Sequence, residues 1–239
     1  MDDLDGLSFL GETFDSFRIT FVRSVEEQEV FRRFGGYPSL AWSLPLGGES
    51  DDIAELLEQR LDELDEEELG KLFGGEERVS FQTWRGRVTV SGGKPLPGEK
   101  VGSVLHIGRC SGWTFALELY GPYEPTQRLL EEISSGTTAV SVERISAKWL
   151  RCLDWAEDGV WKGGGEASSG PFDPPLQALI EQAGVNLEEE DCDLGASLFA
   201  PILSSAFGIR LSLDMVEQSL FTGAFLFPSV NQDRIAKLR

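Results

Sequence analysis

Histidine and cysteine are scarce in this sequence of 239 residues, and their scarcity excludes many kinds of catalytic site. His106 is the one histidine, so most histidine-based metal sites and catalytic centres are excluded. The three cysteines, Cys110, Cys152 and Cys192, are far apart and form no C-x-x-C pair. We therefore expect reduced thiols, as in a cytoplasmic protein, while one chance disulfide stays an open alternative.

Positive charge and long apolar runs are also lacking. Lysine and arginine number 21 against 41 acids, which gives a formal net charge of −20. Such a chain lacks the basic surface that binds nucleic-acid phosphates or anionic lipids. No run approaches the roughly 20 apolar residues of a membrane span, and the N-terminus carries acids where a secretory signal has bases. We expect a cytoplasmic protein with no nucleic-acid or membrane partner.

The negative charge is concentrated in two stretches. Residues 49–77 hold thirteen acids against two bases, and residues 187–193 hold five acids and no base. We call these the acidic segments; together they supply 16 of the 20 excess negative charges. Leucine and isoleucine at helical spacing predict an amphipathic helix in 49–77, with one face docked and the other negative. A solvated helix face is the ordinary interpretation of such a run, and a docking surface for a basic partner is the alternative.

Between these stretches the pattern is typical of an antiparallel sheet. Residues 18–22 are β-branched and aromatic, which predicts a strand, and Ser24 is positioned to cap a following helix. Further along, alternating apolar residues and turn residues predict two hairpins, a helix and two more strands. These elements are expected at 78–84 with 86–91, 101–107 with 113–120, 125–134, 137–146 and 148–155.

The fold class is therefore predicted as α+β, with a largely antiparallel sheet, packed helices and a C-terminal helical subdomain. The stretch 163–170 reads GGGEASSG, a composition typical of a flexible linker. Asp173 followed by two prolines then predicts the start of a helix. The predicted organisation is an acidic leader (1–16), an α+β domain (17–162) containing the acidic helical segment 49–77, the linker (163–170) and the helical subdomain (171–239).

Several stretches together resemble an uncharacterised actinobacterial family, a domain of unknown function. The family has a G-W-T-x-A-L-E hairpin, then a helix, an A-V-S-V strand and an aromatic turn. The matching stretches here are GRCSGWTFALE (108–118), QRLLEEISSG (127–136), AVSV (139–142), WAEDG (155–159) and, in the tail, GIRLS (208–212). The resemblance is best over 101–162 and does not include 49–77. It implies a fold and an actinobacterial or actinophage origin, and it carries no activity and no catalytic residues.

No catalytic constellation stands out among the remaining residues. The glycine-rich stretches lack the lysine and serine of a phosphate loop, and no calcium loop is present. We therefore predict no catalytic residue, no metal and no cofactor. Carboxylates remain as an alternative, because Glu118 and Asp154 lie near the ends of predicted strands, close in sequence to Trp113 and Trp155. Glu118, Asp154 and Trp113 are our candidates for a pocket at the sheet, in a small-molecule-binding domain or a carboxylate- or metal-dependent enzyme.

The leading hypothesis is a non-enzymatic, acidic cytosolic protein that binds a basic protein. Immunity, anti-toxin, anti-defence and inhibitor proteins work in this manner, since complementary charge speeds their encounter with a target. A structural homo-oligomer built through the helical tail is a further alternative, and the sequence leaves the oligomeric state open. The candidate partner-binding residues are Asp62, Glu63, Glu66, Glu67, Glu189 and Glu190.

Overall fold

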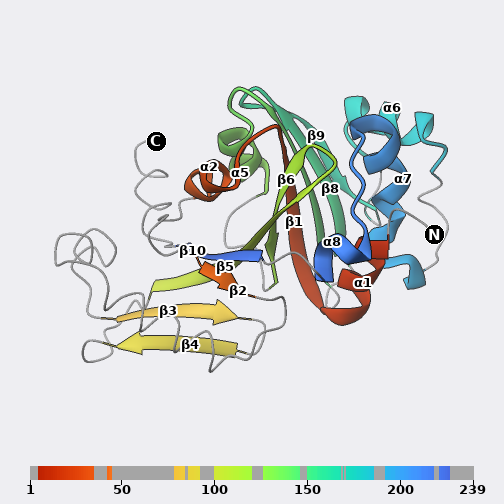
Figure 1. Cartoon of the computed structure of the whole chain (residues 1–239). Coiled ribbons are helices and arrows are strands. Elements are labelled where there is room, and N and C mark those ends of the chain that lie inside the picture. The colour runs from red at the N-terminus through yellow and green to blue at the C-terminus, as the bar shows by residue number, and fades with distance from the viewer. Residues whose placement is uncertain are drawn as a thin grey trace.

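The computed structural model shows an α+β fold in which helices cover both faces of one large sheet (Figure 1). This confirms the fold class expected from the sequence. The structure describes residues 5–34, 42–44, 78–83, 86–91, 100–119, 126–145, 150–167, 169, 171–185, 192–217 and 221–226. The acidic segment 49–77 lies outside these residues.

The sheet has ten strands and is antiparallel except where β3 pairs with β5. Its main path runs β2-β10-β5-β6-β1-β7-β8-β9, and β3 and β4 form a hairpin beside β5. The strand at the N-terminus, β1, therefore lies in the interior of the sheet, between β6 and β7. The strands are β1 (Ser16–Arg23), β2 (Trp42–Leu44), β3 (Arg78–Thr83), β4 (Gly86–Ser91), β5 (Lys100–Cys110), β6 (Trp113–Glu118), β7 (Thr138–Ile145), β8 (Leu150–Glu157), β9 (Val160–Glu166) and β10 (Phe221–Leu226).

Two-residue turns close the hairpins β5–β6 and β8–β9. Ser111 and Gly112 have φ values of 46° and 81°, and Asp158 and Gly159 have values of 51° and 75°. Positive φ at both central residues matches the right-handed twist of the flanking strands, which is why Asp-Gly is a strong hairpin signal. The predicted hairpins at 78–91 and 101–120 are confirmed.

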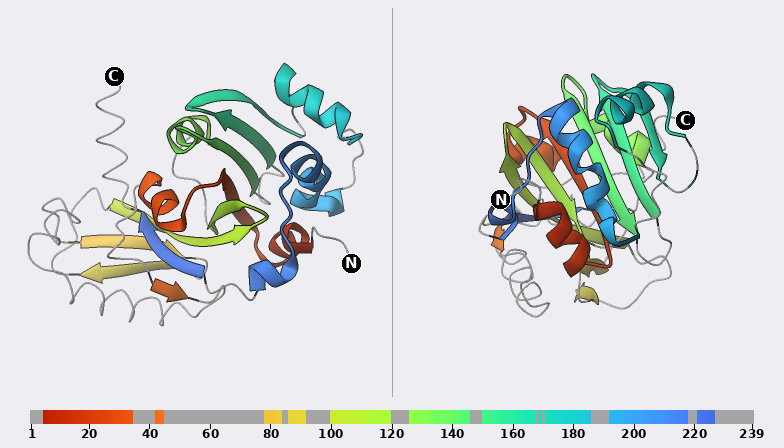
Figure 2. Two further views of the ribbon diagram at one scale, coloured as in Figure 1. Left: turned by 45° about the horizontal axis from the view of Figure 1, so that its top comes forward. Right: turned by 90° about the vertical axis from the view of Figure 1, so that its right-hand side faces the viewer.

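The two faces of the sheet carry separate apolar cores, and Figure 2 shows the helices that cover them. On one face, Val22, Leu105 and Ala139 pack against α2 (Glu27–Arg33) and α5 (Thr126–Ile133). The other face carries Phe17, Phe21 and Val142 and is covered by the remaining helical elements. These are α1 (Asp5–Thr13), α6 (Pro174–Gln182), the 3₁₀ helix η3 (Cys192–Phe199), α7 (Ala200–Ile202), the π-helical turn η4 (Leu203–Phe207) and α8 (Leu213–Glu217).

Residues 5–13 form a docked helix, so the predicted leader over 1–16 is wrong for the part of it that the structure describes. Leu7 and Leu10 of α1 are fully buried in the second core. The guanidinium Nη1 of Arg144 donates to the carbonyl oxygens of Gly11 and Phe14, at 2.7 and 2.9 Å. A cation at the C-terminal carbonyls of a helix satisfies acceptors that have no partner within the helix. The leader was predicted from the acidic composition of this stretch, which gave no weight to its leucines.

The three glycines at 163–165 belong to strand β9, which corrects the predicted linker over 163–170. Each glycine allows another group to approach the strand closely. A Cβ on Gly163 would lie 3.1 Å from Cβ of Asp173, and one on Gly165 would lie 2.8 Å from Cδ1 of Phe172. These glycines are needed for contact with the segment that leads into α6, whereas glycine in a linker provides flexibility.

The described helices that follow residue 171 pack on the sheet. Helices α6, α7 and α8 contribute Leu176, Ile202 and Val216 to the core that contains Phe17 of β1. Strand β10 lies between β2 and β5 in the sheet.

One helix end differs from the sequence prediction, and two other helical segments end at a glycine. Ser24 does not cap α2: it has φ of 52°, and Glu26 occupies the N-cap position. Gly184 and Gly208 both follow helical segments in the left-handed conformation. The next N–H donates back across each turn, from Val185 to Ile180 and from residue 209 to Leu203. The first is a Schellman helix end, whereas the second spans one residue more because it closes the π-helical turn η4.

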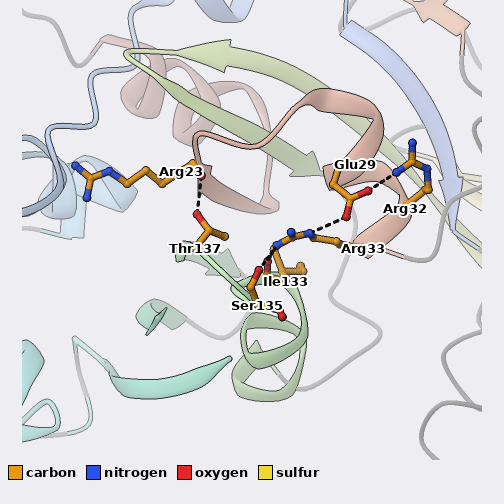
Figure 3. Close-up of polar contacts among 7 residues, drawn as sticks. All are labelled: Arg23, Glu29, Arg32, Arg33, Ile133, Ser135 and Thr137. Carbon is orange, nitrogen blue, oxygen red and sulfur yellow. Dashed lines mark hydrogen bonds and ion pairs between the residues drawn. The ribbon is translucent and has the colours of Figure 1, made fainter. Parts of the chain in front are cut away.

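An arginine joins the two helices of the first face (Figure 3). Nη1 of Arg33 in α2 donates to the carbonyl oxygens of Ile133 and Ser135 at the end of α5, at 2.6 and 2.8 Å. Glu29 accepts from Nε of Arg33 at 3.1 Å and orients the guanidinium. Nearby, the hydroxyl of Thr137 donates to the carbonyl oxygen of Arg23 at 2.6 Å. The helix pair and the start of β7 are thus fixed to the end of β1.

Gly108 provides a test of this packing, because the ring of Phe115 lies across it from the neighbouring strand. A Cβ there would lie 2.5 Å from Cζ of Phe115, so we expect Gly108→Ala to lower the free energy of unfolding by about 1–3 kcal/mol. Gly11 is the control: it lies in α1 with no atom within 4 Å of its Cβ position, and Gly11→Ala should raise stability by about 0.5–1 kcal/mol. Urea unfolding measures both, and equal effects would contradict the packing argument.

Candidate functional site

The sequence proposed two sets of functional residues. Asp62, Glu63, Glu66, Glu67, Glu189 and Glu190 lie outside the described residues. The alternative set, Glu118, Asp154 and Trp113, is described, and it divides between the two faces of the sheet. Glu118 and Asp154 lie on the face covered by α2 and α5, while Trp113 belongs to the core on the other face.

Glu118 belongs to a buried ionic cluster centred on Arg18. Arg18 in β1 lies directly opposite Glu118 of β6 and Glu143 of β7, so the three side chains share one face. Nη1 lies 3.5 Å from Oε2 of Glu118, and Nη2 lies 3.5 Å from Oε2 of Glu143. Arg18, Glu118 and Glu143 are 1%, 4% and 5% exposed. Charges removed from water to this extent are tolerated when they are paired and hydrogen-bonded.

The N-terminus of α5 contributes a hydroxyl to this cluster. Oγ1 of Thr126, the first residue of α5, accepts from Nη2 of Arg18 and donates to Oε2 of Glu143, both at 3.2 Å. The hydroxyl therefore bridges the cation and one of its carboxylates. The cluster connects three strands to the helix above them.

Asp154 lies one row along the same face. It stands opposite Ser141 of β7 and Gly164 of β9, and the hydroxyls of Ser141 and Thr20 hydrogen-bond each other at 3.2 Å. Burial raises the pKa of Asp154 to about 7, and the charge of Glu143 adds to this effect. The guanidinium of Arg18 acts in the opposite direction and only partly offsets these effects. Asp154 is thus a carboxyl group that exchanges its proton near neutral pH.

The described thiols and the histidine are not arranged for nucleophilic chemistry. Burial raises the pKa of Cys110 and of Cys152 to about 12, and the charge of Asp154 further raises that of Cys152. Both are free thiols that stay protonated at neutral pH, whereas nucleophilic attack needs the thiolate. Burial lowers the pKa of His106 to about 4, so its imidazole is neutral. A Cys110–His106 pair therefore lacks the activated form of the nucleophile.

Trp113 stabilises the second core instead of lining a site with Glu118. Its ring meets the edge of Phe207 at 6.5 Å between centroids, and Phe207 also contacts Trp155 at 5.7 Å. On its outer side, the guanidinium of Arg23 stacks over the Trp113 ring at 5.8 Å from the centroid. Such a cation–π contact at an exposed position contributes on the order of 0.5–1 kcal/mol.

The described residues contain neither a metal site nor a membrane-spanning helix. No group of three or more histidine, cysteine, aspartate or glutamate side chains is placed to hold a metal ion within the described part of the chain. In that same part, no helix combines the length and apolar character needed to span a bilayer.

Sequence reasoning identified Glu118 and Asp154 but missed Arg18, Glu143 and Thr126. Arg18 and Glu143 are charged residues inside otherwise apolar strands, and that contrast was the available signal. Recognising the cluster requires the strand register, which pairs residues one hundred or more positions apart.

A comparison with protein families gives one match. The model of a "Family of unknown function (DUF6461)" matches residues 5–228, which is nearly the whole chain. No curated protein and no solved structure matches the chain.

The ionic cluster predicts a large effect for the loss of its cation. We expect Arg18→Met to lower the free energy of unfolding by about 3–5 kcal/mol, because two buried carboxylates then lose their counter-ion. Adding Glu118→Gln and Glu143→Gln should restore most of the loss, since no uncompensated charge stays buried. Thermal and urea unfolding measure this, and a triple variant less stable than Arg18→Met would contradict the argument.

Asp154 and His106 predict opposite effects of pH on stability. The pKa of Asp154 rises from 3.8 to about 7 on folding, so the folded chain binds more protons in that window and stability falls as pH rises. The pKa of His106 falls from 6.5 to about 4, so the unfolded chain binds more protons and stability rises with pH there. Each slope is at most about 1.4 kcal/mol per pH unit.

Single variants separate the two contributions. Between pH 4 and 6.5, stability should rise more steeply with pH in Asp154→Asn than in wild type. The variant lacks the carboxyl group whose ionisation destabilises the fold, and it keeps His106. His106→Gln should show the reverse change in slope over the same window. Urea unfolding at several pH values measures this; parallel curves for the three proteins would show that neither group titrates as described.

Proposed function

Because the chain belongs to this family of unknown function, we infer its role from its own residues: we propose that it binds a basic protein through its acidic segments. In this proposal it works in the cytoplasm without catalysing a reaction, in the manner of an immunity, anti-toxin, anti-defence or inhibitor protein. The observation that carries the proposal is the placement of 16 of 20 excess negative charges in residues 49–77 and 187–193.

Some surface acids within the described fold are paired with arginines, which distinguishes them from the acidic segments. On α2, Glu29 pairs with Arg32 and Arg33, and the preceding Glu26 pairs with Arg109 of β5. These acids are therefore compensated by neighbouring arginines, with little net field beyond the molecule. The acidic segments carry far more acids than bases, which is the charge distribution that attracts a basic partner.

The second acidic segment is bounded by elements that belong to one core. Helix α6 precedes residues 187–193, and η3 begins within them at Cys192. Leu176 of α6 and Phe199 of η3 are both buried in the core that contains Phe17. Both attachments of this segment are thus held by apolar packing, which limits the conformational entropy that binding would cost.

A partner recognised in this way is a protein with a cluster of lysines or arginines. Complementary charge raises the association rate constant and discriminates against partners of the wrong sign. Because salt screens exposed charges over about 8–10 Å, binding of this kind weakens as ionic strength rises.

Neutralising the acidic segments tests the proposal. A variant with Asp62, Glu63, Glu66, Glu67, Glu189 and Glu190 changed to asparagine or glutamine should bind a basic partner at least about tenfold more weakly. The partner is identified by affinity capture at low salt and then purified, and titration across a salt series measures its affinity.

The matched control neutralises an equal number of acids on the described surface, at Glu12, Asp15, Glu131, Glu157, Glu181 and Asp214. This control should retain most of the affinity and of the salt dependence. Equal losses in the two variants, or binding that is insensitive to salt, would contradict the proposal.

The raised pKa of Asp154 favours one second candidate, a small-molecule-binding domain or carboxylate-dependent enzyme that uses the face containing Glu118 and Asp154. A carboxyl group that titrates near neutral pH is suited to proton transfer. A small molecule that raises the melting temperature of the wild type but not of Asp154→Asn would favour this candidate over the first.

A further inference from the structure

Among the described residues, the backbone of the end strand β9 is hydrogen-bonded to the start of α6 at Gly164. The backbone N–H of Asp173, the residue before α6, donates to the carbonyl oxygen of Gly164 at 3.2 Å. The N–H of Gly164 donates in return to Oδ2 of Asp173 at 3.1 Å. Both polar backbone groups of Gly164 are thereby bonded to Asp173, which also protects part of this sheet edge.

The sequence explains why the carboxylate of Asp173 is available for this contact. Asp173 occupies the N-cap position of α6, where an aspartate usually accepts from N–H groups of the first turn. Here the first two helical residues are Pro174 and Pro175, which have no N–H, and Asp173 makes no side-chain capping bond. Its carboxylate binds β9 instead.

Gly164 also contacts Asp154, through its Cα. A Cβ built on Gly164 would lie 1.9 Å from Oδ1 of Asp154 and 3.1 Å from Cζ2 of Trp161. The carboxyl group therefore occupies the space that any other side chain would fill, with the indole of Trp161 beside it. One glycine is in contact with two carboxyl groups, Asp154 on β8 and Asp173 before α6.

The charges around Asp154 are mostly negative. Glu143 on β7 and Asp173 disfavour its ionised form, whereas Arg18 on β1 and the indole N–H of Trp161 favour it. Arg18 also pairs with Glu118 and Glu143, so among the described residues one buried guanidinium faces three carboxyl groups. The other titratable or charged groups on these elements are Arg151, Cys152 and Glu157 on β8, Arg144 on β7, Arg23 on β1, Lys162 and Glu166 on β9, Glu181 on α6, and Arg128, Glu131 and Glu132 on α5.

We propose that a proton on Asp154 controls the docking of α6 on β9: the neutral carboxyl group allows the contact at Gly164, and the ionised group weakens it. An ionised carboxylate in this position is repelled by Glu143 and Asp173 and needs hydration. Water reaches it when β9 or Trp161 moves, and movement of β9 disturbs the bonds between Gly164 and Asp173. This proton-dependent docking of α6 concerns the fold of the chain and does not depend on which partner the acidic segments bind.

Hydrogen exchange of the intact protein tests the proposal. After correction for the intrinsic pH dependence of exchange, protection of the backbone amides of α6 in wild type should fall as pH rises from 6 to 8. A fully linked single proton changes the opening equilibrium by up to about tenfold per pH unit above its pKa. In Asp154→Asn, which keeps the neutral form, protection should be high and independent of pH.

Two comparisons make the result specific. Glu157→Gln removes an exposed carboxylate from the same strand and should keep the wild-type pH profile. In wild type, the side-chain carboxyl carbon of Asp154, followed by NMR, should titrate with the same midpoint as α6 protection; this measurement needs no variant. A flat wild-type profile, a pH-dependent profile in Asp154→Asn, or midpoints that differ by more than one pH unit would each overturn the proposal.

Discussion

The pairing of Arg18 with Glu118 and Glu143 constrains the centre of the sheet more than any other described interaction. A one-residue slip of β1 would turn Arg18 toward the core of Phe17 and Phe21 and leave both carboxylates unpaired. The rest of β1 agrees with this register, because Phe17, Ile19 and Phe21 face one core while Thr20 and Val22 share the face of Arg18. The buried charges add to this specification, because in this register both carboxylates lie beside the guanidinium of Arg18.

Local sequence signals were sufficient for most of the regular structure. Alternating apolar residues and turn residues predicted the two hairpins at 78–91 and 101–120, and the helix expected at 125–134 is α5, whose Leu129, Leu130 and Ile133 are buried. The errors arose where a segment was assigned from its amino-acid composition alone. The acids of α1 favoured a leader, although the leucines of this helix are buried. The glycines that allow close approach in β9 were interpreted as a linker. Composition does not distinguish these cases, because the difference lies in what packs against the residue.

The candidate site shows the same limit. Glu118 and Asp154 were identified as carboxylates near strand ends, and the register brings both to one face. Trp113 was grouped with them by sequence proximity, but alternation along β6 directs it to the opposite face. Arg18, which gives the cluster its counter-charge, is one hundred positions away from Glu118. The partner-binding residues of the acidic segments stay a prediction from charge alone.

The position of β1 between β6 and β7 has a consequence for synthesis of the chain. Arg18 pairs with residue 118 on one side and residue 143 on the other, so β1 cannot complete its ladders until most of the polypeptide has left the ribosome. Contacts this distant in sequence close large loops and slow folding. Meanwhile an eight-residue strand, six of whose residues are buried in the final fold, waits unpaired and is prone to aggregation. The nascent chain therefore needs protection during the interval between the synthesis of its first strand and that of the strands beside it.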